Sequence, residues 1–246
     1  MNQENLLQIR KCIKEAGRVV FLGGAGVSTG SGISDFRSPQ GLYNVQSKYG
    51  RPYEEMLSLS FFESDPETFY DFYWSTMVFP DAKPNAAHLA LADFERRYPN
   101  KLTIITQNID GLHQKAGSKR VLEIHGSTAS YSCCNCGKRY SLEQIKHHGV
   151  PKCTCGGIIK PDVVLYEEPL PEDVFLGAIN ATKFANVLIV AGTSLRVQPA
   201  AMLPDYFSGG KSILINAEPT PLDDHFDYVI REDVGEVLTE ILGEKL

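Results

Sequence analysis

Five nearly continuous apolar runs recur along the chain, each short enough to form a single strand. Runs of this length, bounded by glycine and polar residues, are typical of strands that are buried on both faces of a parallel sheet. We therefore predict a parallel sheet built from residues 18–24, 102–108, 186–194, 212–218 and 227–233.

Between these runs, apolar residues recur every three or four positions, which is the period of an amphipathic helix. The alternation of strands and helices indicates an α/β fold with a Rossmann-like, doubly wound parallel sheet. The predicted helices cover residues 3–16, 64–78, 84–98, 171–184, 199–208 and 233–243.

Two segments interrupt the alternation. One, from 126 to 165, is rich in cysteine and glycine, and the other, from 36 to 83, is rich in aromatic side chains. We predict that the two together form a smaller module inserted into the Rossmann-like part. The Rossmann-like part then comprises approximately residues 1–35, 84–125 and 166–246.

Composition and charge narrow the possible functions. The 246 residues carry a net charge of −6, which argues against nucleic acid as a partner of the whole chain. No stretch reaches the roughly 18 apolar residues needed to cross a bilayer, and the polar N-terminus lacks an export signal. We therefore expect a soluble, cytoplasmic protein with no membrane partner.

A glycine-rich loop, GGAGVSTGSG, follows the first apolar run. Gly24 and Gly26 would let the backbone approach a pyrophosphate, whose charge the N–H groups of a following helix would hold. The strict dinucleotide fingerprint is absent, because Thr29 occupies the place of its third glycine and no acidic residue ends a second strand about 20 residues on. A conventional NAD dehydrogenase is therefore a minor alternative.

Five of the six cysteines fall within 23 positions, which suits reduced, metal-binding thiols better than disulfides. Cys133-x-x-Cys136-Gly and Cys153-x-Cys155-Gly-Gly form two hooks, each closed by a glycine that permits a tight turn. Four thiolates fill a tetrahedral zinc ion, so we predict one structural Zn²⁺ site, with a redox dithiol or buried free thiols as alternatives. Cys134 is the spare cysteine of the cluster.

His125 precedes the cysteines and follows the apolar run RVLEIHG. If four cysteines satisfy the metal, this imidazole is free to act as a general base, a role that its ordinary pKa near neutrality suits. A lone histidine is more often a packed or capping residue, so its position alone makes His125 only a candidate.

The set of motifs resembles the sirtuins, the NAD-dependent protein lysine deacylases. GAGVSTGSGISDFR, TQNIDGLH, EIHG, the cysteine hooks, KPDVVLYEE, AGTSL and INAEPTP occur in the order seen in that family. The resemblance spans about residues 8–240 and implies one catalytic region over 1–246, with little beyond the catalytic core. Glu167 departs from the pattern, since glycine is frequent at its position.

The resemblance implies that NAD is a consumed co-substrate and that the partner is an acylated-lysine protein or peptide. The acyl group would pass to ADP-ribose, giving free lysine, nicotinamide and an O-acyl-ADP-ribose. His125 would be the base, and Asn108 and Asp110 would orient ribose, nicotinamide and water. The cofactor-binding residues would be Gly24, Ala25, Gly26, Asp35, Phe36, Arg37, Gln107, Asn108, Ile109, Asp110, Gly192, Thr193, Ser194, Asn216, Asp233 and Val234.

A substrate peptide can add as a strand between VVLYEE and RVQP, using backbone hydrogen bonds that are independent of its sequence. Family members that prefer succinyl or malonyl groups carry a Tyr-x-x-Arg pair, but Tyr70 is followed here by Tyr73, and Tyr73 by Thr76. We therefore predict acetyl or other short neutral acyl groups. The substrate-binding candidates are Phe36, Ile109, Val164, Leu165, Tyr166, Glu167 and Val197.

Two other functions remain open for the sequence. One is mono-ADP-ribosyl transfer onto protein, and the other is a non-catalytic module that senses NAD or ADP-ribose. The combination of QNID with HG favours catalysis over sensing, because a sensor has no need of a base beside the ribose.

Overall fold

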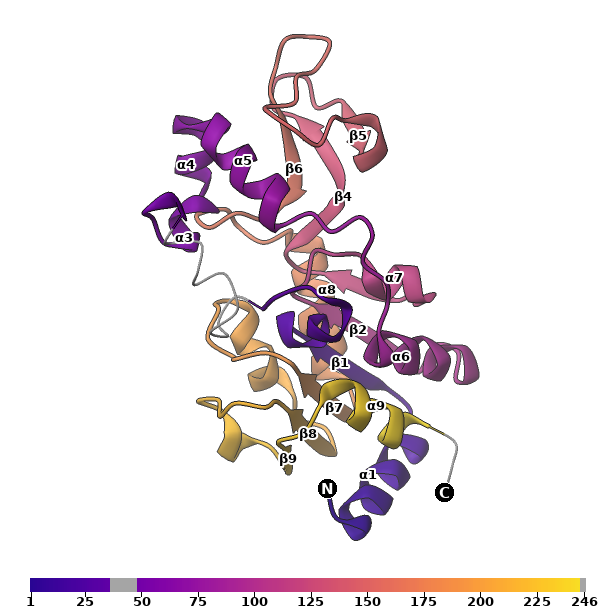
Figure 1. Cartoon of the computed structure of the whole chain (residues 1–246). Helices are drawn as coiled ribbons and strands as arrows, with labels where there is room; N and C mark the ends of the chain where they lie inside the picture. Colours follow the sequence, from indigo (N-terminus) through magenta and orange to yellow (C-terminus); the bar gives the residue numbers. More distant parts are fainter. Residues whose placement is uncertain (36–47, 244–246) are drawn as a thin grey trace.

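The computed structural model describes residues 1–35 and 48–243, and a six-stranded parallel sheet forms its centre (Figure 1). The strand order is β3-β2-β1-β7-β8-β9. The chain winds from β1 out to β3 and later returns to place β7 beside β1, so the winding reverses between β1 and β7. The predicted fold class is confirmed. The strands are β1 Val19–Gly23, β2 Leu102–Thr106, β3 Val121–Glu123, β7 Val187–Ala191, β8 Lys211–Ile215 and β9 Tyr228–Ile230.

Apolar layers cover both faces of this sheet. Val19 and Phe21 belong to the core on one face, and Val20 and Leu22 belong to the core on the other. Side chains alternate across a strand, so an uninterrupted apolar run is what a sheet buried on both faces requires. The first core is packed by α1 Gln3–Glu15, α6 Ala86–Arg97 and α9 Val234–Leu242, and the second by α8 Glu172–Lys183 and η5 Ala200–Tyr206.

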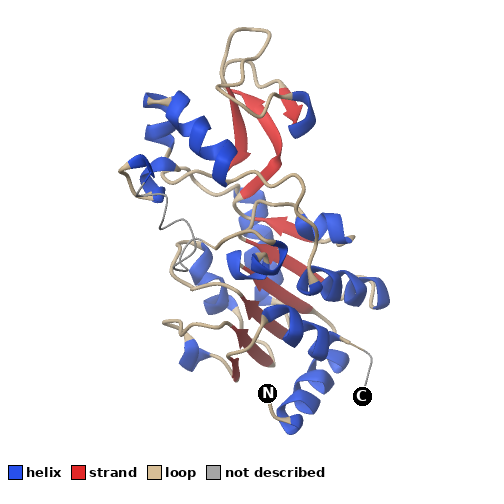
Figure 2. Cartoon of the chain, viewed as in Figure 1, coloured by secondary structure: helices blue, strands red, loops and turns tan. Residues whose placement is uncertain are grey.

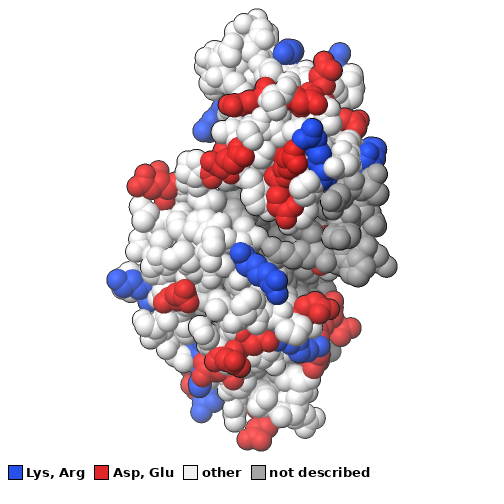
Figure 3. Space-filling view, turned by 90° about the vertical axis from the view of Figure 1, so that its left-hand side faces the viewer, with Lys and Arg blue, Asp and Glu red and all other residues white. Residues whose placement is uncertain are grey.

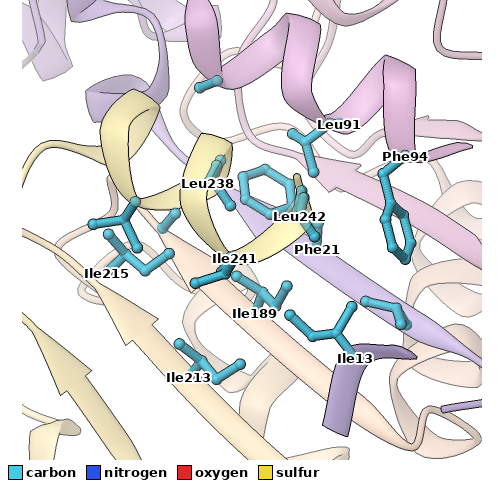
Figure 4. Packing of buried hydrophobic residues seen from close by; sticks show 14 of the residues in the cluster. Ile13, Phe21, Leu91, Phe94, Ile189, Ile213, Ile215, Leu238, Ile241 and Leu242 are labelled. Carbon is cyan, nitrogen blue, oxygen red and sulfur yellow. The ribbon is translucent and has the colours of Figure 1, made fainter. Parts of the chain in front are cut away.

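Figure 4 shows the first core, where α9 lies over the sheet and Leu238, Ile241 and Leu242 point toward Phe21 and Ile189. This helix begins at Asp233, whose carboxylate accepts a hydrogen bond from the Glu236 N–H at 2.9 Å. Such capping satisfies an N–H that has no partner within the helix, and it fixes where the helix starts.

The helix predicted for residues 199–208 is present but of another type. It is the 3₁₀ helix η5 rather than an α-helix, consistent with Pro204 lying inside it and lacking a backbone N–H to donate. After β1 the described chain forms the short 3₁₀ helices η1 Ala25–Val27 and η2 Thr29–Ser31, and the residues that follow Asp35 lie outside the described residues. α7 Leu112–Ala116 and η6 Asp223–His225 are the other short helices of this part.

The smaller module lies above the large sheet, as Figure 2 shows. Its three-stranded sheet has the order β5-β4-β6, with both pairings antiparallel. The aromatic helix α5 packs against this sheet, since Phe69, Tyr70 and Tyr73 are fully buried in one cluster with Tyr131 of β4. The elements are α3 Tyr53–Met56, α4 Leu59–Ser64, α5 Pro66–Thr76, β4 Gly126–Cys133, β5 Arg139–Ser141, η4 Leu142–Gln144 and β6 Ile159–Val163.

Acidic side chains outnumber basic ones between residues 48 and 83, a segment that contains seven Asp and Glu residues and three Lys and Arg residues. Figure 3 shows acidic groups spread over the upper part of one face of the molecule. Among the described helices, none combines the length and apolar character that a membrane span requires.

Candidate active site

The loops that follow the carboxyl ends of β1 and β7 contact each other at the centre of the candidate site. The Gly26 N–H donates to the Gly192 carbonyl at 2.8 Å, so the two loops touch through their backbones. A Cβ on Gly26 would lie 2.8 Å from the Gly192 Cα, and Gly192 has a left-handed φ of 59°. Any side chain at either position would separate the loops. Ligands of doubly wound sheets bind at this reversal of strand order.

The segment after β2 contacts the end of β1 and the loop after β7. Gln107 donates from Nε2 to Thr193 Oγ1 at 3.0 Å, which connects it to the loop after β7. The Gln107 N–H donates to the Gly23 carbonyl at 3.0 Å. The loops that follow three neighbouring strands therefore meet at one place.

Ser28 organises the two predicted catalytic side chains of this segment. Its hydroxyl donates to Asp110 Oδ2 at 2.6 Å and accepts from Asn108 Nδ2 at 3.0 Å. The other carboxylate oxygen of Asp110 accepts from the Leu112 N–H at 2.9 Å. Sequence reasoning missed Ser28, although it stands within the glycine loop and is the first hydroxyl after Gly26.

His125 lies just beyond β3, and its side chain is half-buried. Nδ1 lies 3.0 Å from the Gln107 carbonyl oxygen, which only accepts, so Nδ1 carries the hydrogen and Nε2 keeps a lone pair. Burial lowers the pKa of His125, and the Gln107 carbonyl opposes that shift. The ring is therefore neutral at pH 7, as a general base must be.

His125 is remote from the cysteines. β4 begins at the residue after His125 and ends at Cys133, so the two residues are eight positions apart, or roughly 25 Å along an extended strand at about 3.3 Å per residue. The cluster of possible metal ligands in residues 1–35 and 48–243 contains only Cys133, Cys136, Cys153 and Cys155. The histidine is thus no ligand of that site.

The four predicted cysteines converge at the tips of the two hooks. Their sulfur atoms all lie within 4.8 Å of one another, with 3.5 Å between Cys133 and Cys155 and 3.7 Å between Cys136 and Cys153. Sulfur ligands at about 2.3 Å from a tetrahedral zinc ion are about 3.8 Å apart, so the cluster fits Zn²⁺. Cys134 is exposed and outside the group.

Backbone and side-chain donors favour the thiolate form of Cys153. The backbone N–H of Cys155 and then the Tyr140 hydroxyl, which donates at 3.0 Å, lower the pKa of Cys153 to about 5. Metal ligands are commonly oriented by such outer hydrogen bonds. Tyr140 is a supporting residue that the cysteine spacing gave no reason to single out.

The predicted substrate segment follows β6. The Val164 N–H donates to the His125 carbonyl at 2.9 Å, and Tyr166 forms an isolated parallel bridge with Ser58. Leu165 is buried in the aromatic core, while Val197 is half-buried in the loop before η5. Ile109 accepts from both the N–H and the hydroxyl of Thr128 at 2.9 Å.

The remaining predicted cofactor residues lie toward β8 and α9. Asn216 follows β8, where its Nδ2 donates to the Glu218 carbonyl at 2.7 Å. The carboxylate of Asp233 caps α9, and Val234 belongs to the core of that face, so these two side chains serve the helix. Asp35 is half-buried at the end of the described loop, and Phe36 and Arg37 lie outside the described residues.

The sequence profile of the Sir2 family matches residues 24–199, which is more than half of the chain. The chain belongs to the Sir2 family. It is similar to the NAD-dependent protein deacetylases of Clostridium acetobutylicum and Clostridium perfringens, at 48% and 49% identity over 242 residues. Those alignments cover 97% of this chain and 98% and 99% of the two relatives.

Solved Sir2 structures have the same fold. A Sir2 complex with a p53 peptide and NAD⁺ gives a TM-score of 0.85 at 38% identity and covers 99% of this chain and 98% of that one. A complex with a deacetylated p53 peptide and 3′-O-acetyl ADP ribose gives 0.87 at 39% identity, covering 97% and 98%. The predicted resemblance to sirtuins is therefore confirmed.

Two buried histidines of this Sir2 chain lie next to the Asp110 network. The rings of His88 and His113 are 4.8 Å apart, and His88 contacts Asn85, whose amide donates to the Val27 carbonyl at 2.8 Å. Both nitrogens of His113 are buried without a hydrogen-bond partner. Burial, reinforced by His88, lowers the pKa of His113 to about 3, so the ring is neutral at pH 7.

Replacing one zinc ligand should release the metal. In Cys136→Ala three thiolates remain, and because coordination contributes folding free energy, we expect loss of bound zinc and a lower melting temperature. Metal content by mass spectrometry and thermal unfolding measure the effect. Cys134→Ala is the matched control and should keep its zinc. A stable, active and metal-free Cys136→Ala protein would contradict the assignment.

His113 should make the protein acid-sensitive. Its folded pKa of about 3 is below the unfolded value of about 6.5, so the unfolded state binds more protons between these values and stability falls as pH falls. Between pH 7 and 5, wild type should lose about 2 kcal/mol more than His113→Leu in urea unfolding. His225→Leu, at an exposed site, is the control. Equal losses in wild type and His113→Leu would refute the prediction.

Proposed function

We propose that this Sir2 protein is an NAD-dependent protein lysine deacetylase that moves the acetyl group of a modified lysine to ADP-ribose and releases nicotinamide. The observation that carries the proposal is the hydrogen bond from His125 Nδ1 to the Gln107 carbonyl at 3.0 Å. It gives an imidazole that lies outside the cysteine cluster a fixed tautomer, beside the loop that follows β2. The names of the similar Clostridium proteins support the same activity.

His125 is proposed to take the proton of a ribose hydroxyl through Nε2. The Gln107 carbonyl is proposed to hold the hydrogen on Nδ1 and to stabilise the imidazolium that forms. The carboxylate of the Asp–His pair in a Ser-His-Asp triad has the same role. Asn108 and Asp110, held in place by Ser28, are proposed to orient the ribose, the nicotinamide and the attacking water. Gln107 is proposed to contact the ribose.

The cofactor is proposed to lie across the reversal point between β1 and β7. Gly24, Ala25 and Gly26 with Gly192, Thr193 and Ser194 belong to its two loops, and the glycines let a phosphate approach the backbone closely. Asn216, Asp233 and Val234 are proposed for the adenosine half. Asp35, Phe36, Arg37 and Ile109 are proposed for the nicotinamide end.

The peptide is proposed to dock as a strand between residues 164–167 and the segment that contains Val197. Phe36, Ile109, Val164 and Leu165 are proposed for the acyl-lysine tunnel, whose apolar walls favour an uncharged side chain. The zinc is proposed to be structural only. The two sheets support a division into a Rossmann-like part, 1–35, 84–125 and 166–246, and a module of 36–83 and 126–165. A cytoplasmic location is proposed, as for a bacterial-type deacetylase.

His125→Ala should remove most of the turnover and leave the fold intact. General-base removal costs on the order of 10²-fold or more in kcat. Release of nicotinamide from NAD with an acetyl-lysine peptide measures the effect, and circular dichroism checks the fold. His148→Ala, at an exposed site, is the control. Full activity in His125→Ala would refute the role, and NAD label left on a peptide without acyl-lysine would indicate ADP-ribosyl transfer.

The enzyme should prefer acetyl over succinyl lysine. Tyr70 and Tyr73 are fully buried, with the Tyr70 hydroxyl bonded to the Ile159 carbonyl, and the Thr76 hydroxyl bonds to the Phe72 carbonyl. This helix thus presents no cation to a carboxylate, and we expect kcat/KM to be at least about tenfold higher for the acetyl peptide. Mass spectrometry of a panel of acyl peptides, with and without NAD, gives the ratio. Comparable values would contradict the prediction.

A further inference from the structure

Glu167 adopts a backbone conformation that favours glycine. Its φ is 78°, in the left-handed region, and only two other non-glycine residues of the described chain, Asn100 and Leu195, have a positive φ. A side chain in this region is strained, and such strain persists only where surrounding contacts hold it. Glu167 is the last residue of the segment proposed to bind the peptide, so those contacts bear on the substrate.

The contacts that hold Glu167 come from α4. One carboxylate oxygen accepts from the Ser60 N–H at 2.9 Å, and the other accepts from the Ser60 hydroxyl at 2.9 Å. Both oxygens therefore bind one residue on a different element, 107 positions away in the sequence. We call this pair of hydrogen bonds the Ser60–Glu167 clasp. A glycine would relieve the strain but would form no clasp.

Backbone hydrogen bonds continue the clasp along the strand. The Tyr166 N–H donates to the Leu57 carbonyl at 2.9 Å, and the Leu59 N–H donates to the Tyr166 carbonyl at 3.0 Å. At the other end of the segment, the Val164 N–H donates to the His125 carbonyl at 2.9 Å. Residues 164–167 are thus fixed at one end to the proposed base and at the other to α4.

The next residue along the chain, Glu168, is also acidic but makes different contacts. Glu168 accepts from the Leu165 N–H at 2.8 Å and pairs with Lys160 at 2.8 Å, so it stabilises the local turn after β6. Glu167 alone of the two reaches α4. The Ser60–Glu167 clasp and the bridge between Tyr166 and Ser58 therefore connect the aromatic module to the segment proposed to bind the peptide.

We propose that Glu167 is a positioning residue for the peptide substrate. By clasping Ser60 it holds its own left-handed conformation and fixes residues 164–166 before substrate arrives, so that the strand edge is already formed. A preformed edge lowers the ordering cost of binding. The effect therefore falls on the KM of the acetyl-lysine peptide and not on kcat or on the KM of NAD. This inference rests on the proposed deacetylase function.

The test compares Glu167→Ala, Glu167→Gln and Ser60→Ala with wild type in steady-state deacetylation of an acetyl-lysine peptide. Glu167→Ala loses both hydrogen bonds, and we expect its peptide KM to rise about tenfold while kcat and the NAD KM stay within about twofold. Ser60→Ala keeps its N–H and should show a smaller rise. Glu167→Gln keeps an acceptor, so its peptide KM should stay close to that of wild type. Glu63→Ala, an exposed carboxylate of the same helix, is the control.

A double variant tests the coupling. Ser60→Ala should add nothing to the peptide KM in the Glu167→Ala background, because the clasp is already broken. Additive effects would overturn the clasp. So would an unchanged peptide KM in Glu167→Ala, or a loss confined to kcat or to the NAD KM.

Hydrogen exchange gives a readout that needs no activity. In Glu167→Ala the amides of residues 164–166 should exchange about tenfold faster than in wild type, with the amides of β7 unchanged and with Glu63→Ala like wild type. Unchanged exchange in that segment would overturn the inference whatever the kinetics. An inactive wild type with faster exchange in Glu167→Ala would instead reject the proposed function and keep the clasp.

Discussion

The candidate site depends on backbone contact between the two loops that follow β1 and β7. The Gly26 N–H donates to the Gly192 carbonyl, and a Cβ on Gly192 would lie 2.5 Å from the Val27 nitrogen. Parallel pairing of β1 with β7 brings these loops to the same edge of the sheet, and the missing side chains let them close. The two loops are therefore held in direct contact at the reversal of strand order, where ligands of doubly wound sheets bind.

The candidate base is positioned by main-chain atoms on either side of it. Its Nδ1 binds the Gln107 carbonyl after β2, and its own carbonyl accepts from Val164 of the substrate segment. Because β2 pairs directly with β3, the imidazole is fixed relative to Asn108 and Asp110 as well. Hydrogen bonds therefore connect the His125 imidazole, the Ser28–Asn108–Asp110 network and the segment proposed to bind the peptide. Because these groups are already in place, binding energy is not needed to assemble them.

The strand β4 connects the chemistry to the cysteine cluster. It begins at the residue after His125 and ends at Cys133, the first of the four sulfur ligands. Its partner β6 leads directly into residues 164–167, and the buried aromatic residues of α5 cover the same sheet. A zinc ion bound by these cysteines would thus stabilise the sheet from which the candidate base and the proposed peptide edge extend.

The sequence by itself determined five of the six strands of the large sheet, the long helices and the local chemistry, because these follow from short-range periodicity and spacing. Uninterrupted apolar runs identified the two-sided strands, and the Cys-x-x-Cys and Cys-x-Cys hooks indicated four sulfur ligands. The local pattern did not identify the short strand β3 or the 3₁₀ form of η5. The tertiary structure alone decided which carbonyl orients His125, that Ser28 links Asn108 to Asp110, and that Glu167 binds Ser60. These contacts join residues 18 to 107 positions apart, and only packing brings such residues together.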